Sequence, residues 1–131
     1  MTDDSLDPEL IELAKTLLDA ARKGDAETVR AFLDNGAPAN LRDASGNSPL
    51  MLAAYHGHAA LVTALADRGA DVDLLNDRGQ SPLAGAVFKM DRPTVEALLA
   101  AGADPTAGTP DARGTAAYFG LTEFTDLLGP A

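Results

Sequence analysis

The feature that most constrains this chain is a segment that recurs after 33 residues. Residues 43–73 read DASGNSPLMLAAYHGHAALVTALADRGADVD, and a shift of 33 pairs Pro49 with Pro82 and Ala53 with Ala86. The same shift pairs the Gly-Ala-Asp of residues 69–71 with that of residues 102–104. Self-similarity at a fixed period predicts a solenoid, in which each unit packs against the next along one axis.

Each unit is expected to hold two antiparallel helices. Ser48 supplies a hydroxyl that can cap the free amides of a first helix, and Pro49 fits its first turn. Gly57 can end this helix in the left-handed conformation. A second helix follows, with an apolar stripe at Leu61, Val62 and Leu65. The polar run after residue 70 then predicts a turn or hairpin into the next unit.

The residue pattern resembles that of ankyrin-repeat proteins over roughly residues 12–128. SPLMLAAYHGH is similar to the family's TPLH-x-A start and to its Gly-His between helices, and GADVD is similar to its GADVN end. The resemblance implies an all-α ankyrin-repeat solenoid of stacked helix-turn-helix units joined by β-turn or hairpin loops. It also implies binding of other proteins through the concave face and the hairpin tips.

The chain is expected to form a single ankyrin-repeat domain over residues 1–131, because no linker divides it. Residues 1–7 form a short tail, of which Met1 to Leu6 are expected to be disordered. The repeats that we predict are an N-terminal capping repeat over 8–42, repeat 2 over 43–75, repeat 3 over 76–108 and a truncated C-terminal capping repeat over 109–131.

The terminal units and repeat 3 depart from the pattern. The first helix lacks the Ser-Pro-Leu start, and we expect it to run from Asp7-Pro8 through Leu10, Leu13, Leu17 and Ala21 as a cap. In repeat 3, Gly85 lies inside a helix, Met90-Asp91 replaces Gly-His, and Pro93 fits only a first turn. Repeat 4 aligns at an offset of 63, which shortens its hairpin, so that Thr109-Pro110 is predicted to start its helix early.

The net charge and the residue types of the chain disfavour several classes of function. The formal net charge of −10 disfavours nucleic-acid backbones and anionic membranes, and weakly favours a partner with a basic surface. The chain has no Cys, no export signal at its start and no apolar stretch of membrane-spanning length. We therefore expect a cytoplasmic protein without a cofactor, which is monomeric on its own.

The two histidines are the first candidates for chemistry. His56 and His58 point in different directions on a helix and cannot jointly clamp a metal ion there. His58 occupies the Gly-His position, where the resemblance implies a structural hydrogen bond to neighbouring backbone, whereas His56 is expected to be exposed. Ser48 and Ser81 are read as helix caps, and most acidic residues as caps or turns. We find no catalytic or metal-binding constellation.

One pattern exceeds the structural needs of the repeat. Tyr55, Phe88 and Tyr118 occupy the same slot in successive repeats of a chain with few aromatic residues. Tyr and Phe offer large contact areas at low entropic cost and are frequent in interface hot spots. The row is therefore a candidate contact surface. The alternative reading is that these rings only cover the edge of the core.

The hairpin tips are the second candidate surface, because loops on one face of a solenoid commonly carry binding. Leu74-Leu75 is either tucked against the adjacent hairpin or an exposed apolar tip, whereas Asp43 and Asn76 are predicted to shape the turns. The predicted contact residues of both surfaces are Arg22, Lys23, Tyr55, His56, Phe88, Lys89, Tyr118, Phe119, Arg42, Ser45, Asn47, Leu75, Asp77, Arg78 and Gln80.

Three functions remain open from the sequence. A noncatalytic protein-interaction module is favoured by the repeats and the aromatic row. A metal-binding or enzymatic protein that uses the His56 region is the alternative from a second class. A self-assembling structural or assembly factor is the third.

Overall fold

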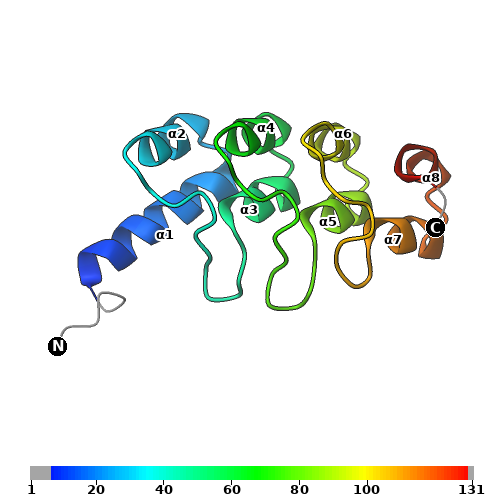
Figure 1. The fold of residues 1–131 in the computed structure, drawn as a ribbon, viewed down its shortest axis with the longest axis horizontal. Helices are drawn as coiled ribbons and strands as arrows, with labels where there is room; N and C mark the ends of the chain where they lie inside the picture. The colour runs from blue at the N-terminus through cyan, green and yellow to red at the C-terminus, as the bar shows by residue number, and fades with distance from the viewer. Residues whose placement is uncertain (1–6, 130–131) are drawn as a thin grey trace.

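The computed structural model describes residues 7–129, and this part of the chain folds into eight helices without a β-strand. The helices are α1 (Pro8–Lys23), α2 (Ala26–Asp34), α3 (Pro49–Tyr55), α4 (Ala59–Asp67), α5 (Pro82–Phe88), α6 (Arg92–Ala100), α7 (Ala112–Tyr118) and α8 (Thr122–Leu128). Figure 1 shows two stacked rows: the odd-numbered helices form an inner row beside the long loops, and the even-numbered helices form an outer row. The all-α solenoid with loop connections is therefore confirmed.

The predicted helix boundaries follow from capping. The Ser48 hydroxyl accepts a hydrogen bond from the Met51 amide at 3.1 Å, and Ser81 does the same for the Ala84 amide at 3.0 Å. Asp7 caps α1 in the same way, by accepting from the Glu9 amide. Gly57 follows α3 with a φ of 81°, a conformation that other residues adopt only with strain.

Small side chains bring the inner helices close together. Ala53, Ala86 and Ala116, which lie at equivalent points of α3, α5 and α7, are fully buried. Larger apolar residues fill the space between the two rows, among them Leu50, Val62, Leu83, Val95 and Phe124. The core is thus one continuous strip that runs along the stack.

His58 ties the first two repeats together. Its Nε2 atom lies 2.9 Å from the carbonyl oxygen of Arg22, at the end of α1. The imidazole also packs so closely on Gly24 that a Cβ atom there would lie 2.5 Å from His58 Nδ1. The structural role that the resemblance implies for His58 is confirmed, and His56 is exposed as expected.

The loops between repeats are built by side chains that imitate backbone turns. Asp43 accepts hydrogen bonds from the amides of Ser45 and Asn47, both at 2.9 Å. Asn76 accepts from the amides of Arg78 and Gln80 in the same manner. The prediction that these two residues shape the turns is confirmed.

The prediction that Thr109-Pro110 starts the first helix of the fourth repeat is wrong. Helix α7 begins at Ala112 rather than at Thr109-Pro110, and Asp111 is its cap, because this carboxylate accepts from the Gly114 amide at 2.6 Å. The Thr109 amide instead donates to the carbonyl of Gly79, at 3.0 Å. This bond holds Thr109 in the loop against the preceding repeat, so the helix starts later than the sequence suggested.

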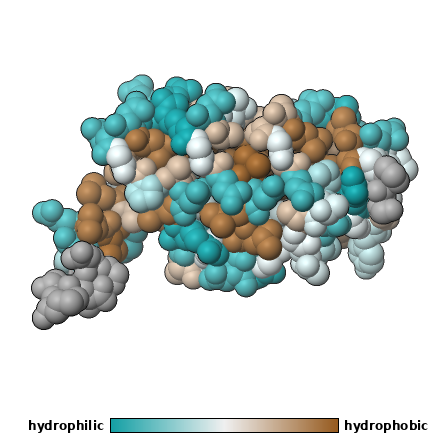
Figure 2. Space-filling model, viewed as in Figure 1, coloured by the Kyte–Doolittle hydropathy of each residue, from teal (hydrophilic) through white to brown (hydrophobic). Residues whose placement is uncertain are grey.

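The apolar stripe of α1 enters the core only in its second half. Leu17 and Ala21 are buried, but Leu10 and Leu13 are 53% and 51% exposed. The first turns of α1 project beyond the stack (Figure 1), and Figure 2 shows hydrophobic surface on this projecting end. The expectation for Met1 to Leu6 and the last two residues of the predicted C-terminal repeat lie outside the described residues. Among those described, no helix is both long and apolar enough to cross a bilayer.

Repeat 3 tolerates its three irregular residues. Gly85 lies within α5, and Pro93 occupies the second position of α6, where no backbone donor is lost. Met90 takes the place of Gly57 with a φ of 54°, and Asp91 caps α6 through Thr94. A non-glycine residue in this conformation costs about 1–2 kcal/mol.

Glycine-to-alanine substitutions should have opposite effects at two positions. A Cβ at Gly85 would lie 3.9 Å from a carbon of the Tyr55 ring, an ordinary contact. We expect Gly85→Ala to raise the free energy of unfolding by about 1 kcal/mol, because alanine favours the helix. Gly69 has a φ of 90°, so Gly69→Ala should lower it by about 1–2 kcal/mol although nothing lies within 4 Å. Urea denaturation measures both, and equal signs would contradict this account.

Candidate protein-binding face

The predicted aromatic row occupies the last turn of each inner helix. Tyr55 ends α3, Phe88 ends α5 and Tyr118 ends α7. Their side chains are exposed, Tyr55 to 46%, Phe88 to 55% and Tyr118 to 83%. The two residues before Tyr55 and the two before Phe88 are buried in the stack, so these helices present the next residue at their edge. In α7 only Ala116 of the pair is buried, and Ala117 is exposed together with Tyr118.

The following slot supplies the neighbours of these rings. The Lys89 ammonium lies 4.2 Å from the centroid of the Tyr55 ring, a cation–π contact between two repeats. The Phe119 ring makes edge-to-face contacts with Phe88, at 5.5 Å, and with Tyr118, at 4.9 Å. Phe88 and Tyr118 are thus joined through Phe119, whereas Tyr55 contacts Lys89 and His56. About half or more of the surface of each of these four aromatic residues stays exposed. Both readings of the row, contact surface and edge cover, are compatible with this geometry.

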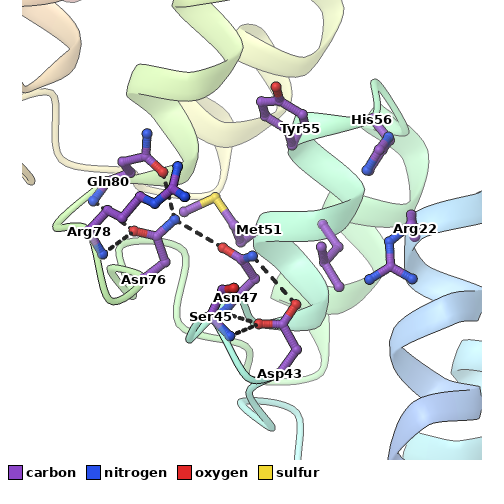
Figure 3. A pocket seen from close by; sticks show the side chains of 11 residues that line it. Arg22, Asp43, Ser45, Asn47, Met51, Tyr55, His56, Asn76, Arg78 and Gln80 are labelled. Carbon is purple, nitrogen blue, oxygen red and sulfur yellow. Dashed lines mark hydrogen bonds between the residues drawn. The ribbon is translucent and has the colours of Figure 1, made fainter.

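A groove of about 350 Å³ joins the inner helices to the loop tips (Figure 3). Seven predicted contact residues line it: Arg22, Ser45, Asn47, Tyr55, His56, Arg78 and Gln80. Asp43, Met51, Leu52 and Asn76 complete its lining. We call this groove, together with the aromatic row and its neighbours Lys23, Lys89 and Phe119, the concave face.

The groove lining includes residues that the sequence analysis did not select. Met51 is the informative one, because the repeat places Ala84 and Gly114 at its equivalent positions. Repeat 1 also holds a large residue at this position, Leu18, whereas the two later repeats hold small ones. Met51 is buried, and Figure 3 shows its sulfur close to the amides of the loop tips.

Arg42 and Asp77 are engaged in holding two loops together. Arg42 Nη2 donates to the carbonyl of Leu75 at 3.1 Å and to the Asp77 carboxylate at 3.2 Å. Its Nε donates to the carbonyl of Gly46. The loop pair is further joined by the Asp77 amide, which donates to the carbonyl of Ser45 at 3.0 Å. Leu74 and Leu75 are half-buried.

The electrostatic environment of the groove is positive at His56. Burial of the imidazole, followed by the charges of Arg22 and Lys89, lowers the pKa of His56 below its ordinary value. His58 contributes in the same direction. Arg22 lies in α1, His58 precedes α4 as its N-cap and Lys89 follows α5 as its C-cap, so three repeats contribute to one local potential.

The described residues offer little for covalent or metal chemistry. Within 7–129, no group of three or more His, Cys, Asp or Glu side chains lies close enough to hold a metal ion. All buried side-chain polar atoms of this part have hydrogen-bond partners, including the caps Ser48 and Ser81.

Comparisons with known proteins agree with the architecture. A family model described as ankyrin repeats in three copies matches residues 17–109. GA-binding protein subunit beta-2 of mouse and of human is 52% identical over 44 residues, which is 34% of this chain and 10% of each relative. A Pseudomonas aeruginosa protein named as an ankyrin repeat protein is 47% identical over 48 residues, 37% of this chain and 28% of that protein. The matches thus span only a small part of these relatives.

Replacing Lys89 should change the titration of His56. We expect Lys89→Gln to raise the pKa of His56 towards its ordinary value, because one of the nearby positive charges disappears. Burial and Arg22 remain, so the pKa should stay below that of a free histidine. An NMR titration of the imidazole protons measures this shift. Arg30→Gln, on the outer helix α2, is the control and should leave it unchanged.

Proposed function

We propose that this chain, which belongs to the ankyrin-repeat family, is a noncatalytic module that binds another protein through its concave face. Ankyrin repeats are a general protein-interaction module, and the described residues supply a surface of suitable kind. The observation that carries the proposal is the exposure of Tyr55, Phe88 and Tyr118 in one slot of successive repeats.

Preorganisation is the physical mechanism. The inner helices are fixed by buried alanines, and the loops by the bonds of Asp43, Asn76 and Arg42. A partner that docks on this face therefore orders few side chains that were free before, which reduces the entropic cost of binding. The aromatic rings are held partly in place by their mutual contacts, which lowers that cost further.

The relatives support the same class of function. GA-binding protein subunit beta-2 is, by its name, one subunit of a larger assembly. Its similarity to this chain covers only 44 residues. A shared repeat fold does not identify the partner that this chain binds.

Truncating the aromatic row should weaken partner binding without unfolding the protein. We expect Tyr55→Ala and Phe88→Ala each to weaken binding by about 1–2 kcal/mol, because each removes a large exposed ring from the centre of the contact. The partner is first captured from cells of the native host and identified, and its affinity is then measured by isothermal titration calorimetry.

Leu13→Ala is the matched control. Leu13 is also a large apolar residue about half exposed, but it lies on the projecting end of α1. Its truncation should leave the affinity unchanged. Unchanged affinity in both aromatic variants, with intact circular dichroism, would show that the concave face is the wrong surface.

A further inference from the structure

The concave face carries a charge opposite to that of the whole protein. The chain has 10 Lys and Arg against 20 Asp and Glu residues. Of the fifteen residues predicted for contact, five are basic (Arg22, Lys23, Arg42, Arg78 and Lys89), and only Asp77 is acidic. The concave face as defined above holds four of the ten cations, Arg22, Lys23, Arg78 and Lys89, against the one carboxylate of Asp43. Cations therefore outnumber carboxylates on this face of an acidic protein.

The carboxylates near this face are already engaged within the protein. Asp77 pairs with Arg42, and Asp19 of α1 pairs with Arg22. Asp43 lines the groove, but one of its oxygens accepts from two loop amides and the other from the Asn47 side chain at 3.4 Å. These acids present less free negative charge to a partner than their number suggests.

Three cations of the face form no ion pair with a carboxylate among residues 7–129. Lys23 nevertheless lies near Asp25, whose pKa is lowered by hydrogen bonds from Thr28 and, to a smaller extent, by the charge of Lys23. The side chains of Lys23 and Arg78 are exposed and make no hydrogen bond or ion pair with this part of the chain. Lys89 is exposed and contacts only the face of the Tyr55 ring. A charge that has no internal partner is available to an external anion, and Figure 3 shows Arg78 at the rim of the groove.

The other end of the face is apolar. Phe88, Tyr118 and Phe119 form a contiguous aromatic cluster at the ends of α5 and α7, and the exposed side chain of Met90 follows Phe88 closely in the chain. Exposed rings in mutual contact leave their outer surfaces free for a third apolar side chain. The face is thus divided into a cationic part near the groove and an apolar part beside it.

We propose that the concave face binds an extended, acidic segment of a partner protein that carries a large apolar side chain at one end. Its carboxylates pair with Lys23, Arg78 and Lys89, and the apolar residue packs on the cluster of Phe88, Tyr118 and Phe119. This inference rests on the proposed function and specifies the chemistry of the partner. It departs from the expectation of a basic partner, which follows from net charge alone.

For a short bound segment, the cations close to it matter more than the net charge of the protein. Salt screens interactions beyond about 8 Å at physiological ionic strength, so a docked carboxylate experiences mainly the cations beside it. A nucleic acid also carries negative charge and could stack on the rings. Its charge, however, extends far beyond the groove, where it would meet the acidic remainder of a chain with a net charge of −10.

The test selects peptides against the full chain from a phage-displayed library of random linear peptides. We expect the enriched sequences to carry several Asp or Glu residues next to Phe, Leu or Trp. The affinity of one enriched peptide is then measured by fluorescence anisotropy. Lys23→Glu/Arg78→Glu/Lys89→Glu should weaken its binding at least about tenfold, and added salt should weaken binding to the unaltered chain.

Matched variants separate local from overall charge. Lys15→Glu/Arg30→Glu/Arg92→Glu makes the same change in net charge at positions outside the groove lining, and it should alter the affinity by less than about twofold. A version of the peptide with Lys in place of its acids should bind the face-reversed variant more tightly than the unaltered chain. This rescue would show that the reversed variant is folded.

The outcomes distinguish this inference from the proposed function. Enrichment of basic or uncharged peptides that still lose affinity in Tyr55→Ala overturns the acidic segment but leaves the binding face intact. Recovery of no peptide overturns the acidic segment and leaves the binding face to be tested with the captured partner. Peptides that bind equally well to Tyr55→Ala and Phe88→Ala overturn both. Displacement of the acidic peptide by an equal concentration of oligo(dT) also overturns the inference, in favour of a nucleic acid.

Discussion

The close approach of the inner helices is the constraint on which the rest of the structure depends. Ala53, Ala86 and Ala116 are fully buried because each lies against a neighbouring inner helix, where a larger side chain would force the repeats apart. Since every unit repeats this contact, an error at one position would shift all later repeats. The distance between loops, and hence the shape of the groove, follows from the size of one side chain.

The same constraint explains why binding residues gather on one face. A short inner helix that buries its small-residue pair has only its last residue and its cap left at the edge, which are Tyr55 and His56 in α3. Glycine then turns the chain away towards the outer helix, with a φ of 81° at Gly57. The side chains at these edge positions contribute little to the core, so their identity can differ between repeats. For example, His56, Lys89 and Phe119 occupy the same position in successive repeats. A fixed backbone with variable edge residues is well suited to recognition.

Much of the fold could be predicted from the sequence because the repeat signals are local. Ser48 and Ser81 cap helices, and Gly57 ends one, through contacts with residues only a few positions away. Errors arose where a contact crosses between repeats. Thr109 is held by Gly79, thirty residues earlier in the chain, and this contact moves the start of α7 to Ala112. The groove could not be predicted for the same reason. It is lined by residues from several segments of the chain, and Met51 was recognised as a lining residue only in the folded structure.

Charge shows most clearly why composition and structure can lead to different expectations. A net charge of −10 describes the field far from the protein, where all side chains contribute equally. Within the screening length of a bound segment, position and internal pairing matter more, because Asp19 and Asp77 are paired with arginines while Arg78 and Lys89 have no paired carboxylate among residues 7–129. The fold thus brings Lys23, Arg78 and Lys89, which are far apart in the sequence, onto one face of a chain whose net charge is −10. An acidic protein can in this way stay soluble through its net charge and still present cations to its partner.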